Sequence, residues 1–301
     1  MPLYRLINEK KQSAWQLEYE RLYSKCLKNK PIDISLDKVA QLTNKDVLWI
    51  MHYEDQLLPE IKSCDALRIA QANGTSANPY CYQVDAAGEL EAMREALDVV
   101  LVFNPQMKTA MQGHFGDIVE YWDVGFPIEV PNIEQKKNRK GVVVAGRISP
   151  DKQFFLSTYL LANFPNMDIP VTFCHMKGEE KWYNLYNPER FNITIKECNR
   201  QEYLEELSKA EYYFTASLGD TSSVSLPEAL LLGCYPLVPQ LKELLPTYDS
   251  YVNVHYEPFS RASVEKLALN KPECKFSTMW FDPKLCAERL DRRLDEIFSR
   301  H

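Results

Sequence analysis

The chain of 301 residues lacks the features of secreted, membrane-spanning and metal-binding proteins. Its opening segment, MPLYRLINEKKQSAW, has no apolar run of signal-peptide length, and no later stretch approaches 18 uncharged apolar residues. Its eight cysteines form no CxxC pair and have no histidine at ligand spacing, so neither a zinc site nor a redox motif is indicated. We therefore expect a cytoplasmic protein with no transmembrane segment and no metal.

A broad basic surface is missing as well. The formal net charge of −7 argues against nucleic-acid binding by neutralisation of many phosphates, although it allows a local basic groove. Apolar residues are plentiful. They make up 45% of the chain, enough to give a real core to two compact α/β domains or to one large domain.

The second half alternates short β-branched or aromatic runs with amphipathic helical stretches, the pattern of a parallel sheet covered by helices. The predicted strands are GVVVAG (141–146), IPVTFCH (169–175), ITIKE (193–197), YYFTAS (212–217) and YPLVP (235–239). The helices predicted between them span 153–163, 200–209 and 226–232. Asn199, with Glu202 three positions later, predicts a capping box at the start of the second of these helices.

The first half is less regular. It carries two candidates for buried strands, DVLWIMH (46–52) and LDVVLVFN (97–104), and candidate helices at 13–27 and 86–96. Because no glycine-rich loop follows an opening strand, we expect a reduced Rossmann-like domain over residues 1–136. The basic stretch 132–141 is the expected linker, with a basic lip on a cleft as the alternative.

The loop after the predicted strand 141–146 is the first candidate site. It reads GRISPDK, from Gly146 to Lys152, and leads into a helix. A glycine at a strand end lets backbone come close to a ligand, and Arg147 and Lys152 place two cations on one loop, which suits a diphosphate. The alternative is two solvated charges at an ordinary strand–helix turn.

The segment LGDTSSVSLPEALLLGCYPLVP (218–239) is the second candidate site. Its loop of small polar residues, with Asp220 and Ser222, enters a helix near Pro227 whose first backbone N–H groups would form an anion site. Glu228 in the first turn can accept both hydroxyls of a ribose, or can simply complement the helix dipole. Both loops follow predicted parallel strands, at whose carboxyl ends open α/β sheets bind ligands.

In this order, the two segments resemble family 4 retaining glycosyltransferases of the GT-B fold. The family pattern is a G-R-x-x-x-x-K loop, then a glutamate, a second glutamate followed by alanine, and a G-x-P-V-V strand. The resemblance implies an α/β fold with two Rossmann-like domains facing across a cleft. Residues 137–282 would bind the nucleotide sugar, and residues 283–301, which carry an amphipathic helix with Leu285, Leu290, Leu294 and Ile297 on one face, would return to the first domain.

The resemblance also implies donor-binding roles. Arg147 and Lys152 would hold the donor diphosphate and stabilise it as it leaves, and Glu228 would bind the ribose. Asp220 stands where the family has a glutamate that touches the donor sugar, so the identity of the sugar stays open. Further donor contacts would come from Gly146, Ser222, the backbone N–H groups of Ser223 and Val224, and, at the base, Cys198 and Asn199.

The first half would supply the acceptor side. His52 ends the predicted strand 46–52, and family members often place a histidine at such a strand end to touch the donor sugar. A structural role for a lone histidine is the alternative. Glu54 follows His52, and Asn73, Gly74 and Thr75 form a polar loop that would line the cleft.

The resemblance implies a metal-independent hexosyl- or pentosyltransferase that moves a sugar from a UDP- or GDP-sugar co-substrate to a hydroxyl, with no other cofactor. The chain contains no Asp-x-Asp motif, the usual metal–diphosphate clamp of the other major glycosyltransferase fold. The pieces HYEDQLLPE, DVVLVFN and GCYPLVP are similar to segments of tRNA-queuosine mannosyltransferases, which makes a modified base of tRNA or DNA a candidate acceptor. Two alternatives stay open: action on a cell-surface or lipid-linked glycan, and a non-catalytic nucleotide-sugar-binding protein. The oligomeric state is not indicated.

Overall fold

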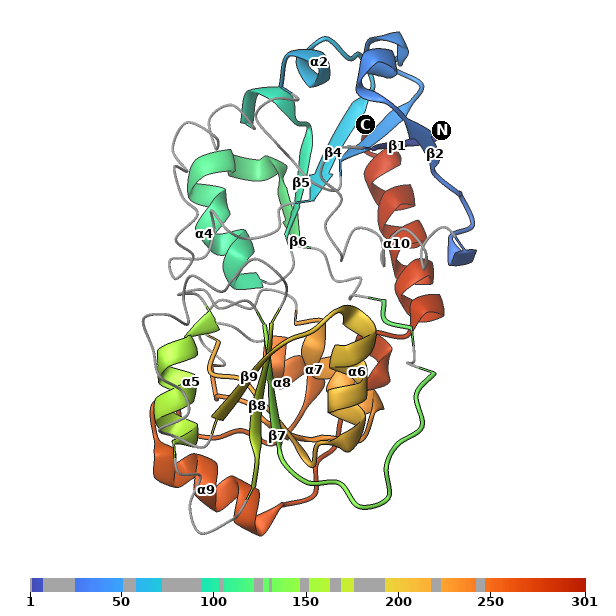
Figure 1. The fold of residues 1–301 in the computed structure, drawn as a ribbon. Helices are drawn as coiled ribbons and strands as arrows, with labels where there is room; N and C mark the ends of the chain where they lie inside the picture. Colours follow the sequence, from blue (N-terminus) through green and yellow to red (C-terminus); the bar gives the residue numbers. More distant parts are fainter. Residues whose placement is uncertain are drawn as a thin grey trace. The chain divides into compact units, whose positions relative to one another are not determined.

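The chain forms two compact units, residues 1–129 with 279–301 and residues 130–278, each a parallel α/β domain (Figure 1). The computed structural model describes residues 2–7, 25–50, 58–71, 94–102, 105–121, 127–129, 132–146, 152–162, 169–175, 193–217, 223–241 and 247–301. The expected domain limits, 1–136 with 283–301 and 137–282, differ from these units by a few residues.

The N-terminal domain contains a six-stranded parallel sheet in the order β2-β1-β3-β4-β5-β6. Its strands are β1 (Leu3–Leu6), β2 (Ile32–Ile34), β3 (Val47–Ile50), β4 (Leu67–Gln71), β5 (Val99–Val102) and β6 (Val119–Tyr121). Its helices are η1 (Leu36–Gln41), α2 (Leu58–Lys62), α4 (Pro105–Phe115), η3 (Gly116–Ile118) and α10 (Pro283–Phe298), and η7 (Thr278–Trp280) lies at the boundary between the units.

The sequence pattern predicts only two strands of this sheet, β3 and β5, and their burial shows why. Every residue of VLWI and VVLV is buried, because both strands are flanked on each side and covered on both faces. The other four strands are shorter or carry polar residues and give no such run. Within the described residues this sheet has six strands and the C-terminal sheet five, so the described part of the sheet shows no sign of the reduction expected for the first domain.

Helix α10 confirms the amphipathic helix expected within residues 283–301. Asp282 caps it by accepting a hydrogen bond from the Leu285 N–H, and Pro283 occupies the first turn, where its missing N–H costs nothing. Its buried residues are Cys286, Ala287, Leu290, Leu294 and Ile297. The expected face was therefore wrong at Leu285, which is 40% exposed. Helical spacing places Leu285 one position before the buried stripe.

Ion pairs hold α10 within the first domain. The two carboxylate oxygens of Glu120 on β6 form ion pairs with Arg293 and Arg300: Oε2 lies 2.7 Å from Arg293 Nη2, and Oε1 lies 2.7 Å from Arg300 Nη2. The Asp291 carboxylate accepts the backbone N–H of Lys28 at 2.8 Å. Sequence-distant ends of the domain are joined in this way.

The C-terminal domain contains a five-stranded parallel sheet in the order β11-β10-β7-β8-β9. Its strands are β7 (Val142–Ala145), β8 (Val171–His175), β9 (Ile193–Glu197), β10 (Tyr212–Phe214) and β11 (Tyr235–Leu237). Its helices are α5 (Phe154–Leu161), α6 (Arg200–Lys209), α7 (Ser225–Leu231), α8 (Thr247–Tyr251) and α9 (Arg261–Asn270). Figure 1 shows α5 and α9 on one side of this sheet and α6 and α7 on the other.

The sequence pattern located all five of these strands and the helices α5, α6 and α7 to within a few residues. The capping box is confirmed, since the Asn199 side chain accepts from the Glu202 N–H and the Glu202 carboxylate accepts from the Asn199 N–H. The predicted strand 212–217 ends earlier, at Phe214, and Thr215 to Ser217 continue as buried irregular chain.

The basic stretch 132–141 is not a linker that stands apart from the domains. It lies within the second unit, where the Lys136 N–H donates to the Ser208 carbonyl. Arg139 binds the ends of two helices: its guanidinium donates to the carbonyls of Leu207 and Ala210 at the end of α6, at 3.0 and 2.7 Å, and of Leu232 at the end of α7, at 2.7 Å. The last carbonyls of a helix lack partners within it, and a cation there complements the helix dipole.

Gly233 makes room for this arrangement. Its φ of +77° belongs to the left-handed region that ends many helices, and a Cβ atom there would lie 2.7 Å from Arg139 Nη1. Both the backbone and the space at this position therefore require glycine.

Replacing Arg139 by methionine should destabilise the C-terminal domain by about 2–3 kcal/mol, because several helix-end carbonyls lose a charged donor. Urea unfolding followed by circular dichroism measures this change. Lys137→Met is the matched control, since Lys137 is exposed on the same segment. Equal unfolding midpoints for the two variants would contradict the role given to Arg139.

Candidate functional site

The carboxyl ends of β7, β8 and β10 lie together, because these strands are parallel neighbours in the sheet. Gly146 follows β7 with a φ of +141°, a backbone conformation that L-residues with a side chain rarely adopt. A Cβ atom on Gly146 would contact the stem of Lys152, with Cγ at 3.7 Å. The Lys152 stem therefore lies against Gly146 at the strand end, and two expected donor-binding residues come together there.

Gln153 turns the chain from Lys152 into α5. Its backbone is left-handed, with φ of 52° and ψ of 49°, which is uncommon for a residue other than glycine or asparagine. Such conformations cost of order 1 kcal/mol and are found where the surroundings fix them, often beside a binding site. Here the conformation fixes where Lys152 leaves the backbone.

A small cavity of about 20 Å³ lies at these strand ends, and we call it the strand-end cavity. Four of its lining residues have polar side chains, namely Lys152, Ser157, His175 and Thr215, and the others are Val144, Ala145, Gly146, Phe154, Phe173 and Cys174. Ser157, His175 and Thr215 are each less than 5% exposed. Polar side chains are thus concentrated where a doubly wound sheet binds its ligands.

Glu228 lies in the first turn of α7 and is 2% exposed. Its Oε1 atom is 2.7 Å from Nη2 of Arg200, the first residue of α6. An exposed glutamate that only complements the helix dipole would not need such a partner. A buried carboxylate does, because burial without a cation is costly. The Arg200 guanidinium thereby orients the Glu228 side chain.

A layer of tyrosines lies close to this pair. The Tyr213 hydroxyl is 2.7 Å from Ser225 Oγ, and the Tyr203 hydroxyl donates to the Ser225 carbonyl at 3.5 Å. Burial raises the pKa of the Tyr203 hydroxyl well above its usual value, and the Glu228 carboxylate raises it further. Tyr203 therefore stays a neutral donor at physiological pH.

The remaining described donor-side residues have definite local roles. The Ser223 hydroxyl accepts the Leu226 N–H at 3.3 Å, and the Val224 carbonyl accepts the Glu228 N–H, so both residues help to form the first turn of α7. The Asn199 side chain is engaged in the capping box of α6. A base would therefore meet the backbone near Asn199 rather than its amide group.

Cys198 is buried, and its N–H donates to the His175 carbonyl at 2.8 Å. Its thiol is hydrogen-bonded to that of Cys174, and burial raises the pKa of both. Cys198 is thus a packed, protonated thiol at the ends of β8 and β9, and its expected place near the base remains a prediction.

The other expected site residues lie outside the described residues. On the donor side these are Arg147, Asp220 and Ser222, and on the acceptor side His52, Glu54, Asn73, Gly74 and Thr75. Their roles remain predictions.

Three residues at the site were not identified from the sequence. His175 ends the predicted strand 169–175. His52 was selected because it is a histidine at the end of a predicted strand, and the same criterion would have identified His175. No local sequence pattern marks Arg200 as a site residue, because its ion-pair partner Glu228 is distant in the sequence. Ser157 is an ordinary helix residue by pattern, and only the tertiary structure brings it to the strand-end cavity.

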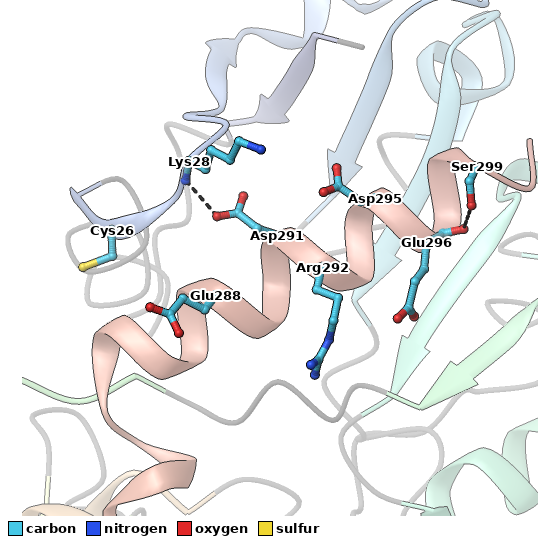
Figure 2. Close-up of a pocket in the computed structure, with 8 residues that line it drawn as sticks. All are labelled: Cys26, Lys28, Glu288, Asp291, Arg292, Asp295, Glu296 and Ser299. Carbon is cyan, nitrogen blue, oxygen red and sulfur yellow. Dashed lines mark hydrogen bonds between the residues drawn. The ribbon is translucent and has the colours of Figure 1, made fainter.

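A larger hollow of about 640 Å³ lies in the N-terminal domain between α10 and the segment around Cys26 (Figure 2). Figure 2 shows Asp291 beside the Lys28 backbone and Arg292 projecting away from it. The lining contains four carboxylates, from Glu288, Asp291, Asp295 and Glu296, against the cations of Lys28 and Arg292. This excess of negative charge disfavours a diphosphate, so the hollow does not replace the strand ends as the donor site.

The described residues contain no group of three or more histidine, cysteine, aspartate and glutamate side chains arranged to hold a metal ion. Within the described ranges, every helix falls short of the length and apolar character needed to cross a bilayer.

Neither a protein-family model nor a curated protein sequence matches the chain. Solved structures do match it. Anabaena HepE in complex with UDP-glucose aligns over 100% of both chains, with a TM-score of 0.70 and 11% identity. The pneumococcal O-GlcNAc transferase GtfA in complex with UDP and GlcNAc aligns over 87% of this chain and 58% of its own, with a TM-score of 0.60 and 14% identity.

S. aureus TarM aligns over 85% of this chain and 52% of its own, with a TM-score of 0.57 and 12% identity. The chain thus spans little more than half the length of GtfA and TarM, and the whole length of HepE. At these identities the likeness concerns the fold. Two parallel-sheet α/β domains and these matches show that the chain has the GT-B fold.

Proposed function

We propose that this protein is a glycosyltransferase that moves a sugar from a nucleotide-diphosphate donor to a hydroxyl group. The observation that carries this proposal is the contact of Gly146 and Lys152 at the end of β7, together with the buried Glu228 in the first turn of α7, the helix that follows the neighbouring strand β10. The segments that follow two adjacent parallel strands thus carry a cation for the diphosphate and a carboxylate for the ribose. We propose UDP as the nucleotide, because HepE and GtfA were solved with UDP or UDP-glucose.

In the proposed reaction, the bond between the anomeric carbon and the distal phosphate oxygen breaks, and the oxygen of the acceptor hydroxyl bonds to that carbon with retention of configuration. The proton of the hydroxyl passes to the departing diphosphate. Negative charge builds up on the departing diphosphate. Lys152, with Arg147 from the same loop, would stabilise that charge, which is the kind of electrostatic term that dominates many enzymes. Positioning of the acceptor beside the donor would supply the rest of the rate.

We propose no single acceptor. A modified base of tRNA or DNA and a cell-surface or lipid-linked glycan are the two candidate classes, and both present a hydroxyl. The net charge of −7 gives no support for the nucleic acid. Incubation of the protein and UDP-sugar with an acceptor panel of each class, read by mass spectrometry, distinguishes them.

UDP should raise the melting temperature of the protein, because a ligand that binds only the folded state stabilises it in proportion to affinity and concentration. Lys152→Met should weaken UDP binding by roughly tenfold or more, since it removes a charged donor while keeping the stem that packs on Gly146. Lys266→Met, at an exposed position on α9, is the control. Equal UDP affinity in the Lys152 and Lys266 variants would show that the donor site lies elsewhere.

Glu228 can be tested through the ribose itself. If its carboxylate accepts the ribose hydroxyls, the parent should bind 2′-deoxy-UDP or 3′-deoxy-UDP about tenfold more weakly than UDP. In Glu228→Gln the preference for UDP over the deoxy analogues should shrink, because the substitution and the missing hydroxyl disrupt the same hydrogen bond. Calorimetric titration of both proteins measures it. An undiminished preference in the variant would assign the ribose to another residue, whatever the variant does to stability.

An enzyme and a non-catalytic binder differ in turnover. A glycosyltransferase should release free sugar slowly from UDP-glucose or UDP-GlcNAc in water, and Lys152→Met should suppress this release because the leaving diphosphate loses its cation. Chromatography of the products follows the reaction. Tight binding of UDP with no hydrolysis and no transfer to any acceptor would identify a binder.

A further inference from the structure

Ser157 lies in the middle of α5 and is 1% exposed. Its N–H donates to the Gln153 carbonyl at 2.8 Å, so its backbone is ordinarily helical. Its hydroxyl is different: among the described residues, none offers a hydrogen bond to Ser157 Oγ. Leaving a buried hydroxyl without a partner costs about 1–3 kcal/mol, so native proteins rarely do it without a reason.

The adjacent residue shows that this situation is not forced by the helix. Thr158 is also fully buried, and its Oγ1 donates to the Phe154 carbonyl at 3.0 Å. Thr158 therefore satisfies its hydroxyl within α5. Ser157 instead lines the strand-end cavity, and Thr158 does not.

The strand-end cavity has the size and the chemistry for one oxygen atom of an anion. Its volume of about 20 Å³ exceeds the roughly 10–15 Å³ that one water molecule needs, so the cavity can hold one oxygen atom. Lys152 and Gly146 border it, and His175 lines it from the end of β8. The His175 carbonyl accepts a hydrogen bond from the Cys198 N–H at 2.8 Å, which fixes the backbone position from which the imidazole projects.

We propose that Ser157 and His175 form a recess that binds one non-bridging oxygen of the distal phosphate of a nucleoside diphosphate. The Ser157 hydroxyl and an imidazole N–H donate to that oxygen, while Lys152 neutralises the phosphate from the rim. This assignment rests on the proposed function and adds two side chains that contact the donor. It explains why the hydroxyl of Ser157 is buried beside a cation.

Ser157→Ala tests the recess because a purely structural role of the hydroxyl and a role in phosphate binding predict opposite results. Removal of an unpartnered hydroxyl should leave the melting temperature of the free protein unchanged or higher. Removal of a phosphate ligand should weaken UDP binding by roughly tenfold, and leave binding of UMP, which has no distal phosphate, unchanged. Calorimetric titration with UDP and UMP gives the ratio of the two affinities, with GDP and GMP as a parallel pair.

Thr158→Val is the matched control. It also removes one buried hydroxyl from α5, but this hydroxyl has an internal acceptor. We expect a lower melting temperature and an unchanged ratio of UDP to UMP affinity. His175→Ala should lower that ratio as Ser157→Ala does, and the ratio remains informative even if this variant is less stable.

The outcomes separate the two proposals. If the parent binds neither UDP nor GDP, the proposed function and the recess both fail. If the parent binds a diphosphate and Ser157→Ala keeps the same ratio of diphosphate to monophosphate affinity, only the recess fails. An equal loss of UMP binding, or a clear fall in the melting temperature of free Ser157→Ala, also overturns the recess, because the hydroxyl would then act elsewhere.

Discussion

Arg139 joins the parts of the C-terminal domain on which the site depends. Its guanidinium binds the final carbonyls of α6 and α7, and these two helices begin at the site with Arg200 and Glu228 near their opposite ends. One cation thus fixes the helices at their carboxyl ends, and one ion pair fixes them at their amino ends. The separation of the helices, and with it the place of the buried carboxylate, follows from these two contacts.

The site is built from polar groups that the fold buries at a cost. Glu228, Ser157 and His175 are all nearly inaccessible, in a domain whose strands are otherwise packed with apolar side chains. Gln153 adds an unfavourable backbone conformation beside them. Stability alone would favour apolar residues at such places, so the burial of these polar groups supports the proposed binding of a ligand that makes hydrogen bonds there.

Much of the C-terminal domain could be predicted from local pattern. The five strands alternate with helices, the capping box at Asn199 marks the start of α6, and the glycine after β7 marks the loop that carries Lys152. Four strands of the N-terminal sheet could not be predicted in this way, since β1, β2, β4 and β6 are short or partly polar and owe their conformation to pairing with neighbours. The contacts of the stretch 132–141 could not be predicted for a related reason, because the acceptors of Arg139 lie at the ends of two helices distant in the sequence.

The sequence by itself determined the α/β class, the order of elements in the second half, and the loop and helix that carry Lys152 and Glu228. These features are local, since they depend on periodicity, capping and glycine at fixed offsets. Only the tertiary structure decided that Arg200 orients Glu228, that Arg139 joins two helix ends, and that Ser157 and His175 meet at one cavity. Each of these contacts joins residues from different elements, and no short stretch of sequence records which buried polar group will meet which.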